Sequence, residues 1–304
     1  MSEPLRMRGT WYIVPTPFDT TGELDLASLG RLVEAALGWG VDGLTVMGVM
    51  AEPGALSSAE RAASLRSVFD TAAGRLPIAV GCSGGALATT LELIAQARAL
   101  GACAAMVTAP PLFRNIDQLP EYYRQAAAAG LPLVIQDEPN ATGVVIPVSI
   151  LLASAAASGN RTMKIEDPPT PPKIGRLLAG NAELDIFGGL GGVSALGELR
   201  RGACGTMTGF AYPEILRAVR ERLEAGGIRG AGLLFDRYLP LIQFEGQQVI
   251  GLGIRKEVLR RRGIFATHRT RSLSPILDAT TLEELDELFD RLGIVPGPDA
   301  FAAG

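Results

Sequence analysis

The sequence predicts an α/β fold of the (β/α)8 (TIM) barrel type, followed by a C-terminal helical extension. Short apolar runs alternate with segments in which apolar residues recur at helical spacing. Eight such pairs fill about the first 220 residues, which matches the size and order of this barrel. The remainder of the chain keeps the helical spacing. We therefore assign residues 1–226 to the barrel and residues 227–304 to the extension.

The predicted elements follow one another in a regular order. The strands are residues 9–14, 43–47, 77–81, 104–108, 133–137, 162–166, 185–187 and 205–208. The helices are residues 26–37, a segment from Ser57 onward, and residues 89–100, 119–129, 149–157, 172–178, 195–200, 214–225, 228–239, 249–262 and 282–292. Ser57 and Glu60 have the spacing of a capping box, which fixes the start of the second helix. Residues 296–304 are expected to form a loose tail.

A doubly wound parallel sheet is the competing architecture for the same alternation. Its first strand is followed by a glycine-rich turn that binds phosphate, whereas this chain has Pro15-Thr16-Pro17-Phe18 there. The glycine run at residues 188–192 follows the seventh predicted strand instead. Because phosphate sites of barrels lie near that strand, the run is a weak signal for a phosphorylated ligand.

Composition and charge exclude several functional classes. The formal net charge of -4 and the pI near 5.3 indicate no basic surface, so we expect neither nucleic acid nor an anionic membrane as a partner. Cys82, Cys103, Cys204 and His268 lack the spacing of metal ligands, so we predict no metal and no cofactor. With no apolar signal segment and no run of about 20 apolar residues, a cytoplasmic protein is expected.

An amine and a carboxylate interrupt the sixth predicted strand. Because side chains alternate along a strand, Lys164 and Glu166 project to one side, and Met163 and Ile165 to the other. If the first side faces the barrel interior, the amine and the carboxylate are neighbours in a desolvated site. A buried ammonium is costly unless it is paired or loses its proton, and the free amine is a nucleophile. The pattern predicts Schiff-base chemistry on Lys164; the alternative is an ion pair that only stabilises the barrel.

Several motifs, in order along the chain, resemble the dihydrodipicolinate synthase and N-acetylneuraminate lyase family over nearly the whole length. The resemblance implies a (β/α)8 barrel that binds a 2-oxo acid, with Lys164 as the Schiff-base lysine. It also implies a homo-oligomer, either a dimer or a tetramer. The motifs are Gly9-Thr10 with Pro15-Thr16-Pro17-Phe18, Gly48 to Glu52, Gln136 to Gly143, Lys164, and Gly202-Ala203-Cys204-Gly205.

Some positions depart from the pattern of this family. Where the family has paired hydroxyls, this chain has Val49 and Met50, so only the backbone N–H groups of that turn are left to hold a carboxylate. The proton-shuttling tyrosine of the synthase is matched by Gln136, whose amide does not titrate. The arginine expected near the entrance is matched by Ala141. These losses argue against the condensation of pyruvate with aspartate semialdehyde.

The pairing of Lys164 with Glu166 resembles the branch of the family that dehydrates 2-keto-3-deoxy sugar acids. In that branch the glutamate acts as acid and base, so the resemblance makes Lys164 and Glu166 the catalytic residues. Dehydration and retro-aldol cleavage pass through the same enamine, so both reactions stay open. The small 2-oxo acid substrate is expected to contact Gly48, Val49, Met50, Gln136, Gly189 and Thr208.

Two other functions also stay open. A dihydrodipicolinate synthase with an altered proton relay would keep Lys164 and replace the tyrosine by other groups. A barrel that binds a 2-oxo acid without turnover would explain the missing hydroxyls equally well. Formation of a product separates an enzyme from such a binding protein. For Glu166, a role as acid and base competes with a role as the counter-ion of Lys164.

Overall fold

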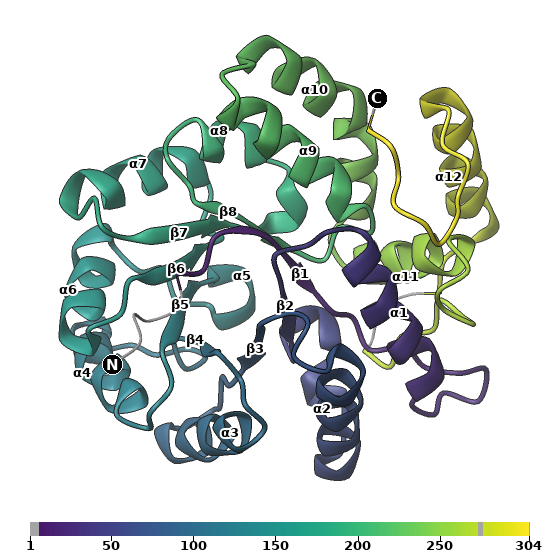
Figure 1. Cartoon of the computed structure of the whole chain (residues 1–304). Coiled ribbons are helices and arrows are strands. Elements are labelled where there is room, and N and C mark those ends of the chain that lie inside the picture. Colours follow the sequence, from purple (N-terminus) through teal and green to yellow (C-terminus); the bar gives the residue numbers. More distant parts are fainter. Residues whose placement is uncertain (1–5, 273–275, 304) are drawn as a thin grey trace.

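The strands of the protein form a closed barrel, which the computed structural model in Figure 1 shows surrounded by helices. The structure describes residues 6–272 and 276–303. The strands are β1 (Gly9–Ile13), β2 (Gly43–Val46), β3 (Ile78–Gly81), β4 (Ala104–Thr108), β5 (Leu133–Asp137), β6 (Thr162–Ile165), β7 (Asp185–Gly188) and β8 (Gly205–Thr208). They pair in parallel and in chain order, and β8 pairs with β1. The predicted (β/α)8 barrel is therefore confirmed.

Helices connect the strands and cover the outside of the barrel. Those of the barrel are α1 (Leu26–Gly38), α2 (Ser58–Ala72), α3 (Leu87–Ala99), α4 (Leu119–Ala127), α6 (Val148–Ser158), α7 (Thr170–Gly180), α8 (Ala195–Leu199) and α9 (Pro213–Glu224). Loops carry the short turns η1 (Val49–Ala51), η2 (Pro53–Ala55), η3 (Ile116–Gln118), η4 (Leu190–Gly192) and α5 (Pro139–Thr142). The predicted capping box is confirmed, because Ser57 and Glu60 exchange side-chain to backbone hydrogen bonds at the start of α2.

The helices after α9 are α10 (Ile228–Glu245), α11 (Gly251–Arg261) and α12 (Ala279–Leu292), and they lie together on one side of the barrel (Figure 1). The prediction that the first of them ends at residue 239 is wrong. Pro240 lacks a backbone N–H, yet α10 continues past it to Glu245. Apolar side chains on both sides of Pro240 are buried, so packing outweighs the lost hydrogen bond.

The prediction of a loose tail is also wrong for residues 296–303. The Trp39 indole donates a hydrogen bond to the carbonyl of Pro298, and the buried Arg262 guanidinium donates to the carbonyls of Gly297 and Asp299. Phe301 packs edge-on against Tyr212. The tail is therefore fastened to the barrel by contacts with residues far away in the sequence.

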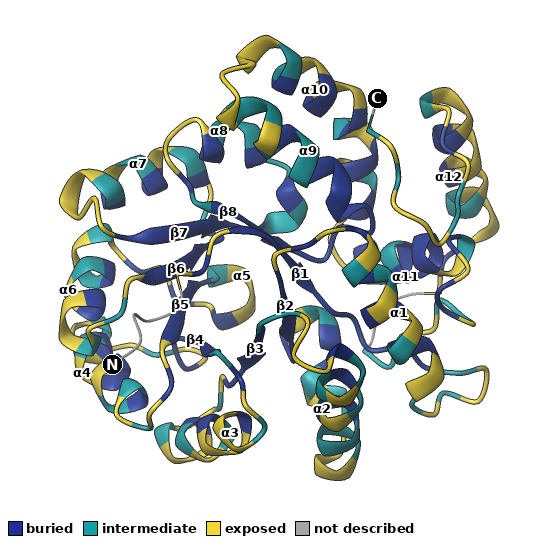
Figure 2. Cartoon of the chain, viewed as in Figure 1, coloured by how far each residue is buried: buried dark blue, intermediate teal, exposed yellow. Residues whose placement is uncertain are grey.

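Two apolar cores stabilise the barrel. One fills its interior and contains Trp11, Met106, Phe187 and Met207, all at most 2% exposed. The second lies between the strands and the helices, and Figure 2 shows buried residues along the strands and on the faces of the helices that meet them. Gly43 allows the Trp11 ring to enter the interior, since a Cβ there would lie 2.7 Å from the ring. The strands are thus buried on both sides, as parallel barrels require.

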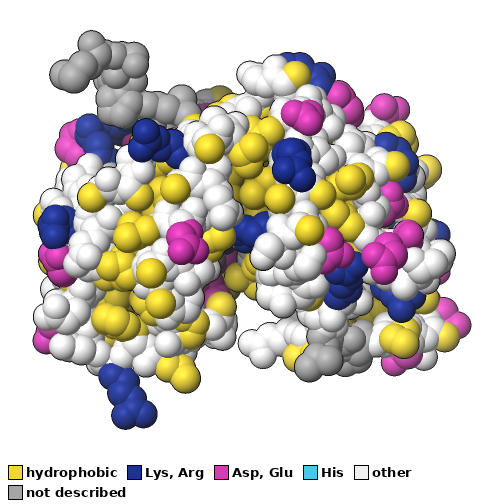
Figure 3. Space-filling model, turned by 90° about the horizontal axis from the view of Figure 1, so that it is seen from below, with side chains coloured by type: hydrophobic (Ala, Val, Ile, Leu, Met, Phe, Trp, Pro, Cys, Tyr) yellow, Lys and Arg dark blue, Asp and Glu magenta, His cyan; other side chains and the backbone are white. Residues whose placement is uncertain are grey.

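The surface carries charges of both signs. On the face shown in Figure 3, basic and acidic side chains are interspersed with apolar ones, and a groove divides the face. Within the described residues, the helices fall short of the length and apolar character needed to cross a membrane.

Candidate active site

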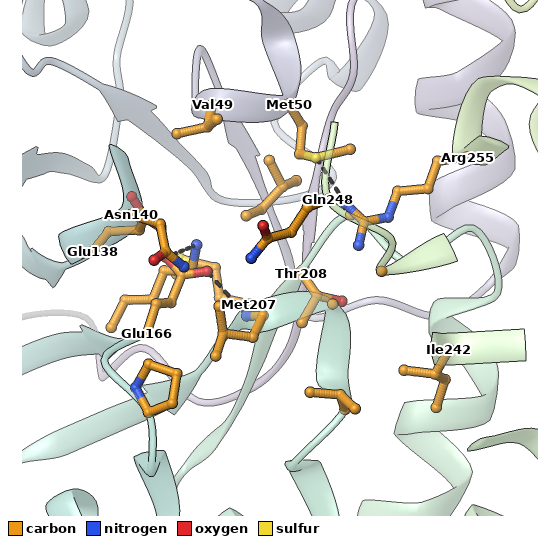
Figure 4. A pocket seen from close by; sticks show the side chains of 18 of the residues that line it. Val49, Met50, Glu138, Asn140, Glu166, Met207, Thr208, Ile242, Gln248 and Arg255 are labelled. Atoms are coloured by element: carbon orange, nitrogen blue, oxygen red, sulfur yellow. Dashed lines mark hydrogen bonds and ion pairs between the residues drawn. The ribbon is translucent and has the colours of Figure 1, made fainter. Parts of the chain in front are cut away.

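A cavity of about 630 Å³ opens at the carboxyl ends of the strands. Its lining comes from the segments that follow β2, β5, β6 and β7, from the end of β8, and from α10 and α11. This is the end of a (β/α)8 barrel at which substrates bind. Figure 4 shows side chains from these segments pointing into the same space. Among the predicted site residues, Val49, Met50, Gln136, Lys164, Glu166 and Thr208 line it.

Lys164 lies on β6 and points into the barrel. Its neighbours in the sheet register are Gln136 on β5 and Phe187 on β7. The Lys164 side chain is only 3% exposed, and its Nζ lies 2.7 Å from Glu166 Oε2. The alternation of side chains along β6 therefore brings the predicted amine and carboxylate together in a buried pair.

Three groups hold the Glu166 carboxylate in place: an amide, an ammonium and a backbone N–H. Oε2 accepts a hydrogen bond of 2.7 Å from Gln136 Nε2 and pairs with Lys164, and Oε1 accepts one of 3.0 Å from the backbone N–H of Leu190. Burial alone would raise the pKa of the Glu166 carboxyl, but the Lys164 charge and these hydrogen bonds outweigh it and hold the pKa below its ordinary value. In this state Glu166 is an ionised carboxylate.

The segment after β7 determines where the Glu166 carboxylate can lie. Leu190 adopts the left-handed region with φ 48°, an uncommon conformation for a branched residue, and this conformation accompanies its hydrogen bond to Glu166. Gly189 packs directly against the carboxylate, because a Cβ at this position would lie 2.3 Å from Glu166 Oε1. Gly189 thus makes room for Glu166, and it does not itself line the cavity.

The turn after β2 forms another wall of the cavity. Gly48 precedes η1, and the first N–H groups of such a turn have no acceptor inside it. Glu52 closes the turn in the left-handed region with φ 51°, and its carboxylate pairs with Lys256 of α11 at 2.5 Å. Thr16 Oγ1 also donates to the carbonyl of Ala51. The turn is therefore fixed from both sides. Gly48 itself borders a smaller neighbouring cavity of about 220 Å³.

Thr142, Cys82 and His268 do not line the cavity. Thr142 donates its hydroxyl proton to the carbonyl of Glu138, and Cys82 is fully buried. His268 Nδ1 lies 2.8 Å from Glu257, and neither residue lines the cavity. In the part of the chain that the structure describes, no group of three or more His, Cys, Asp or Glu side chains is placed to hold a metal ion.

Five polar residues that line the cavity are missing from the sequence-based prediction: Glu138, Asn140, Gln243, Gln248 and Arg255. Asn140 enters from α5, Gln248 from the segment between α10 and α11, and Arg255 from α11. Figure 4 shows Arg255 across the cavity from Glu166, with Gln248 between them. None of the five is distinguished from a surface residue by a local sequence signal. Gln243, Gln248 and Arg255 reach the barrel only through the packing of the C-terminal helices.

Comparison with known proteins places this geometry in a family. A model of the dihydrodipicolinate synthetase family matches residues 6–288. The chain belongs to the dihydrodipicolinate synthetase family. It is 32% identical over 296 residues to an L-2-keto-3-deoxyarabonate dehydratase of Azospirillum brasilense, and the matched region covers 94% of this chain and 95% of that relative. It is 28% identical to a 4-hydroxy-tetrahydrodipicolinate synthase of Acidobacterium capsulatum, with 92% and 94% of the two chains covered.

A solved structure supports the same assignment. The crystal structure of a dihydrodipicolinate synthase from Rhodopseudomonas palustris superposes with a TM-score of 0.88 at 34% identity, covering 94% of this chain and 97% of that one. The fold and the family predicted from the motifs are thus confirmed, and the chain is a lyase of this family. The relatives include both dehydratases and synthases, so the family alone leaves the substrate open.

Proposed function

We propose that the protein dehydrates a 2-keto-3-deoxy sugar acid through a Schiff base on Lys164, with Glu166 as acid and base. The observation that carries the proposal is the 2.7 Å contact between Lys164 Nζ and Glu166 Oε2, buried in the cavity at the carboxyl end of the barrel. The similarity over nearly the whole chain to an L-2-keto-3-deoxyarabonate dehydratase supports the same class of reaction.

Glu166 first prepares the nucleophile. The Lys164 ammonium has to lose a proton before it can attack a ketone, and Glu166 Oε2 is within hydrogen-bond distance to accept that proton. The free amine then adds to C2 of the 2-oxo acid, and water leaves as the protonated imine forms. Glu166 supplies the proton for this departing water and returns to the carboxylate form.

Proton transfer at C3 and loss of the C4 hydroxyl follow. The Glu166 carboxylate takes a proton from C3, and the electron pair of the C–H bond moves into the imine to give a neutral enamine. The enamine then forms the C3–C4 double bond, and the C4 hydroxyl leaves as water with the proton that Glu166 holds. Hydrolysis of the resulting imine releases the product and the amine, so one water is lost overall.

The charges of the pair favour this sequence of steps. The cation beside Glu166 holds the pKa of its carboxyl down against the effect of burial. When the imine becomes a neutral enamine, that cation disappears, and burial then favours the protonated carboxyl. Glu166 therefore becomes an acid at the stage at which the C4 hydroxyl needs a proton. One buried carboxylate can serve both steps because they occur in sequence.

Gln136 supports dehydration over condensation. Its Nε2 donates a hydrogen bond of 2.7 Å to Glu166 Oε2 and so orients the carboxylate. By resemblance, this position holds the proton-shuttling tyrosine of the synthase, and an amide cannot carry out that transfer. Val49, Met50 and the rest of the turn after β2 offer backbone N–H groups for the C1 carboxylate.

Turnover of a panel of 2-oxo acids tests the proposal. We expect one or more 2-keto-3-deoxy sugar acids in the panel to lose water, which mass spectrometry detects directly. Release of pyruvate and an aldehyde would instead indicate retro-aldol cleavage. Condensation of pyruvate with aspartate semialdehyde would identify a synthase. Ligand-dependent stabilisation without any product would identify a binding protein. Each of these three outcomes would refute the proposed dehydration.

A further inference from the structure

Arg255 reaches the substrate cavity from outside the barrel. It belongs to α11, and its side chain is 12% exposed where it lines the cavity. Figure 4 shows Arg255 on the opposite side of the cavity from Glu166, with Gln248 and Thr208 between them. Burial lowers the pKa of the Arg255 guanidinium from its ordinary value, and the charges of Glu245 and Glu166 act in the opposite direction. The cavity thus has a reacting end at Lys164 and a basic end at Arg255.

Among residues 6–272 and 276–303, Arg255 has only weak partners for its donors. Nη1 lies 3.0 Å from Met50 Sδ, and a thioether sulfur is a weak acceptor. The nearest carboxylate oxygen, Glu245 Oε2, is 3.6 Å from Nε, which exceeds hydrogen-bond distance. By contrast, Arg262, which lies two turns further along the chain, is 2.7 Å from a Glu214 oxygen. Arg255 therefore keeps most of its hydrogen-bonding capacity for a ligand.

Glu245 neutralises Arg255 only in part. Burial raises the pKa of the Glu245 carboxyl to about 7, so it is partly protonated near neutral pH. An arginine stays protonated under the same conditions. The basic end of the cavity therefore holds positive charge that a bound anion can complement.

The loop after β7 leaves space for the guanidinium. Gly191 has φ 68°, and a Cβ at this position would lie 2.6 Å from Arg255 Nη2. Any other residue there would push the guanidinium away from the cavity wall. The glycine of this loop and the arginine of α11 thus fit together, although they are 64 positions apart in the sequence.

We propose that Arg255, with Gln248 and Thr208, forms a distal subsite that binds a carboxylate at the end of the substrate remote from the ketone. The inference rests on the proposed function, because the bond to Lys164 fixes C2 at the reacting end and directs the rest of the chain across the cavity. A guanidinium binds a carboxylate through two parallel charge-assisted hydrogen bonds and binds a hydroxyl or methyl group far less strongly. The preferred substrates are then 2-oxo acids that carry a second, terminal carboxylate.

Two five-carbon acids that differ only at the far end test this subsite. The probes are 2-oxopentanedioate and 2-oxopentanoate, with pyruvate as the probe that lacks a tail, and dissociation constants are measured on the full chain by calorimetry. The wild type is expected to bind the dicarboxylate about 10- to 100-fold more tightly than the monocarboxylate, as charge-assisted hydrogen bonds imply. Arg255→Met should remove this difference, while pyruvate affinity stays within about threefold, because pyruvate does not reach the subsite.

Matched variants separate the subsite from general effects. Arg260→Met, on the exposed side of the same helix, should keep the full preference. Arg255→Lys keeps the charge without the planar fork and should retain only part of the preference; it also provides the test if Arg255→Met does not fold.

Two affinity results would overturn the subsite, and borohydride trapping separates its failure from that of the proposed function. Equal affinities of the wild type for both acids would show that the site does not recognise a terminal carboxylate. An equal loss of pyruvate affinity in Arg255→Met would assign Arg255 to the C1 carboxylate instead. If borohydride traps pyruvate on Lys164 and yet the dicarboxylate shows no preference, the subsite fails while the proposed function stands. If no adduct forms with any probe, both fail.

Discussion

Replacement of Glu166 by glutamine separates its role in proton transfer from its role in structure. Glutamine has the same size, and its amide oxygen can still accept the backbone N–H of Leu190. It cannot take a proton from C3 or return one to the C4 hydroxyl. General acid and base groups contribute about 10²- to 10⁴-fold to rate. We therefore expect Glu166→Gln to lower kcat by this factor, which corresponds to about 3 to 5 kcal/mol of transition-state stabilisation.

The expected change in KM for this variant is small. Glu166 contacts Lys164, Gln136 and Leu190 and is not expected to hold a substrate carboxylate, so KM should stay within about threefold of wild type. Steady-state kinetics with a 2-keto-3-deoxy acid gives both constants, and borohydride trapping reports whether the imine still forms. Asp167→Asn is the matched control, because this neighbouring carboxylate pairs with Lys173.

Two results for the glutamine variant would contradict the mechanism. A kcat within about threefold of wild type would exclude Glu166 as acid and base and leave it the counter-ion of Lys164. If Asp167→Asn lowers kcat as much as Glu166→Gln does, any change of charge near β6 is sufficient to lower the rate, and the loss is not evidence for proton transfer by Glu166.

Other predictions concern the packing and charges around the site. Gly189→Ala should lower kcat at least about 10-fold, because the new Cβ would lie 2.3 Å from Glu166 Oε1, and unchanged kinetics would refute the steric argument. Lys256→Met should lower the free energy of unfolding by about 3 to 5 kcal/mol in urea titrations, because it leaves the Glu52 carboxylate buried without its cation; a change below about 1 kcal/mol would show that water reaches Glu52. Burial raises the pKa of the Glu198 carboxyl to about 7. The stability that its protonated form contributes is therefore complete below about pH 4.5 and is lost as the pH rises to about 7. Over this range the free energy of unfolding of the wild type should fall by about 3 kcal/mol more than that of Glu198→Gln, and parallel curves of unfolding free energy against pH for the two proteins would refute the assignment.

The sequence carries the information for the barrel in local patterns. Each strand is a short apolar run between turn residues, and the predicted bounds of β4, β5 and β8 agree with the structure. The two-residue spacing of Lys164 and Glu166 also suffices to put both groups on one side of β6, because the alternation of side chains along a strand is a local property. This is why the central pair of the site is accessible to reasoning from the sequence.

The remaining parts of the site depend on long-range packing. Arg255 is 91 positions from Lys164 and belongs to a helix that could pack in several ways. The left-handed backbone of Leu190 and Glu52 is maintained by tertiary contacts and has no signature in these residue types. Pro240 shows the reverse case. A proline is a strong local signal for the end of a helix, but the burial of apolar side chains before and after it outweighs this signal. Local propensity thus predicts the scaffold, and tertiary contacts determine which distant residues complete the cavity.

Reductive trapping of the imine tests the central claim most directly. The chain contains three lysines, and Lys173 and Lys256 are both buried in ion pairs with carboxylates outside the cavity. After treatment with pyruvate and borohydride, peptide mapping should find the adduct on Lys164 alone, and Lys164→Ala should abolish it. Absence of any adduct from the wild type, or an adduct on Lys173 or Lys256, would contradict the assignment of Lys164 as the nucleophile.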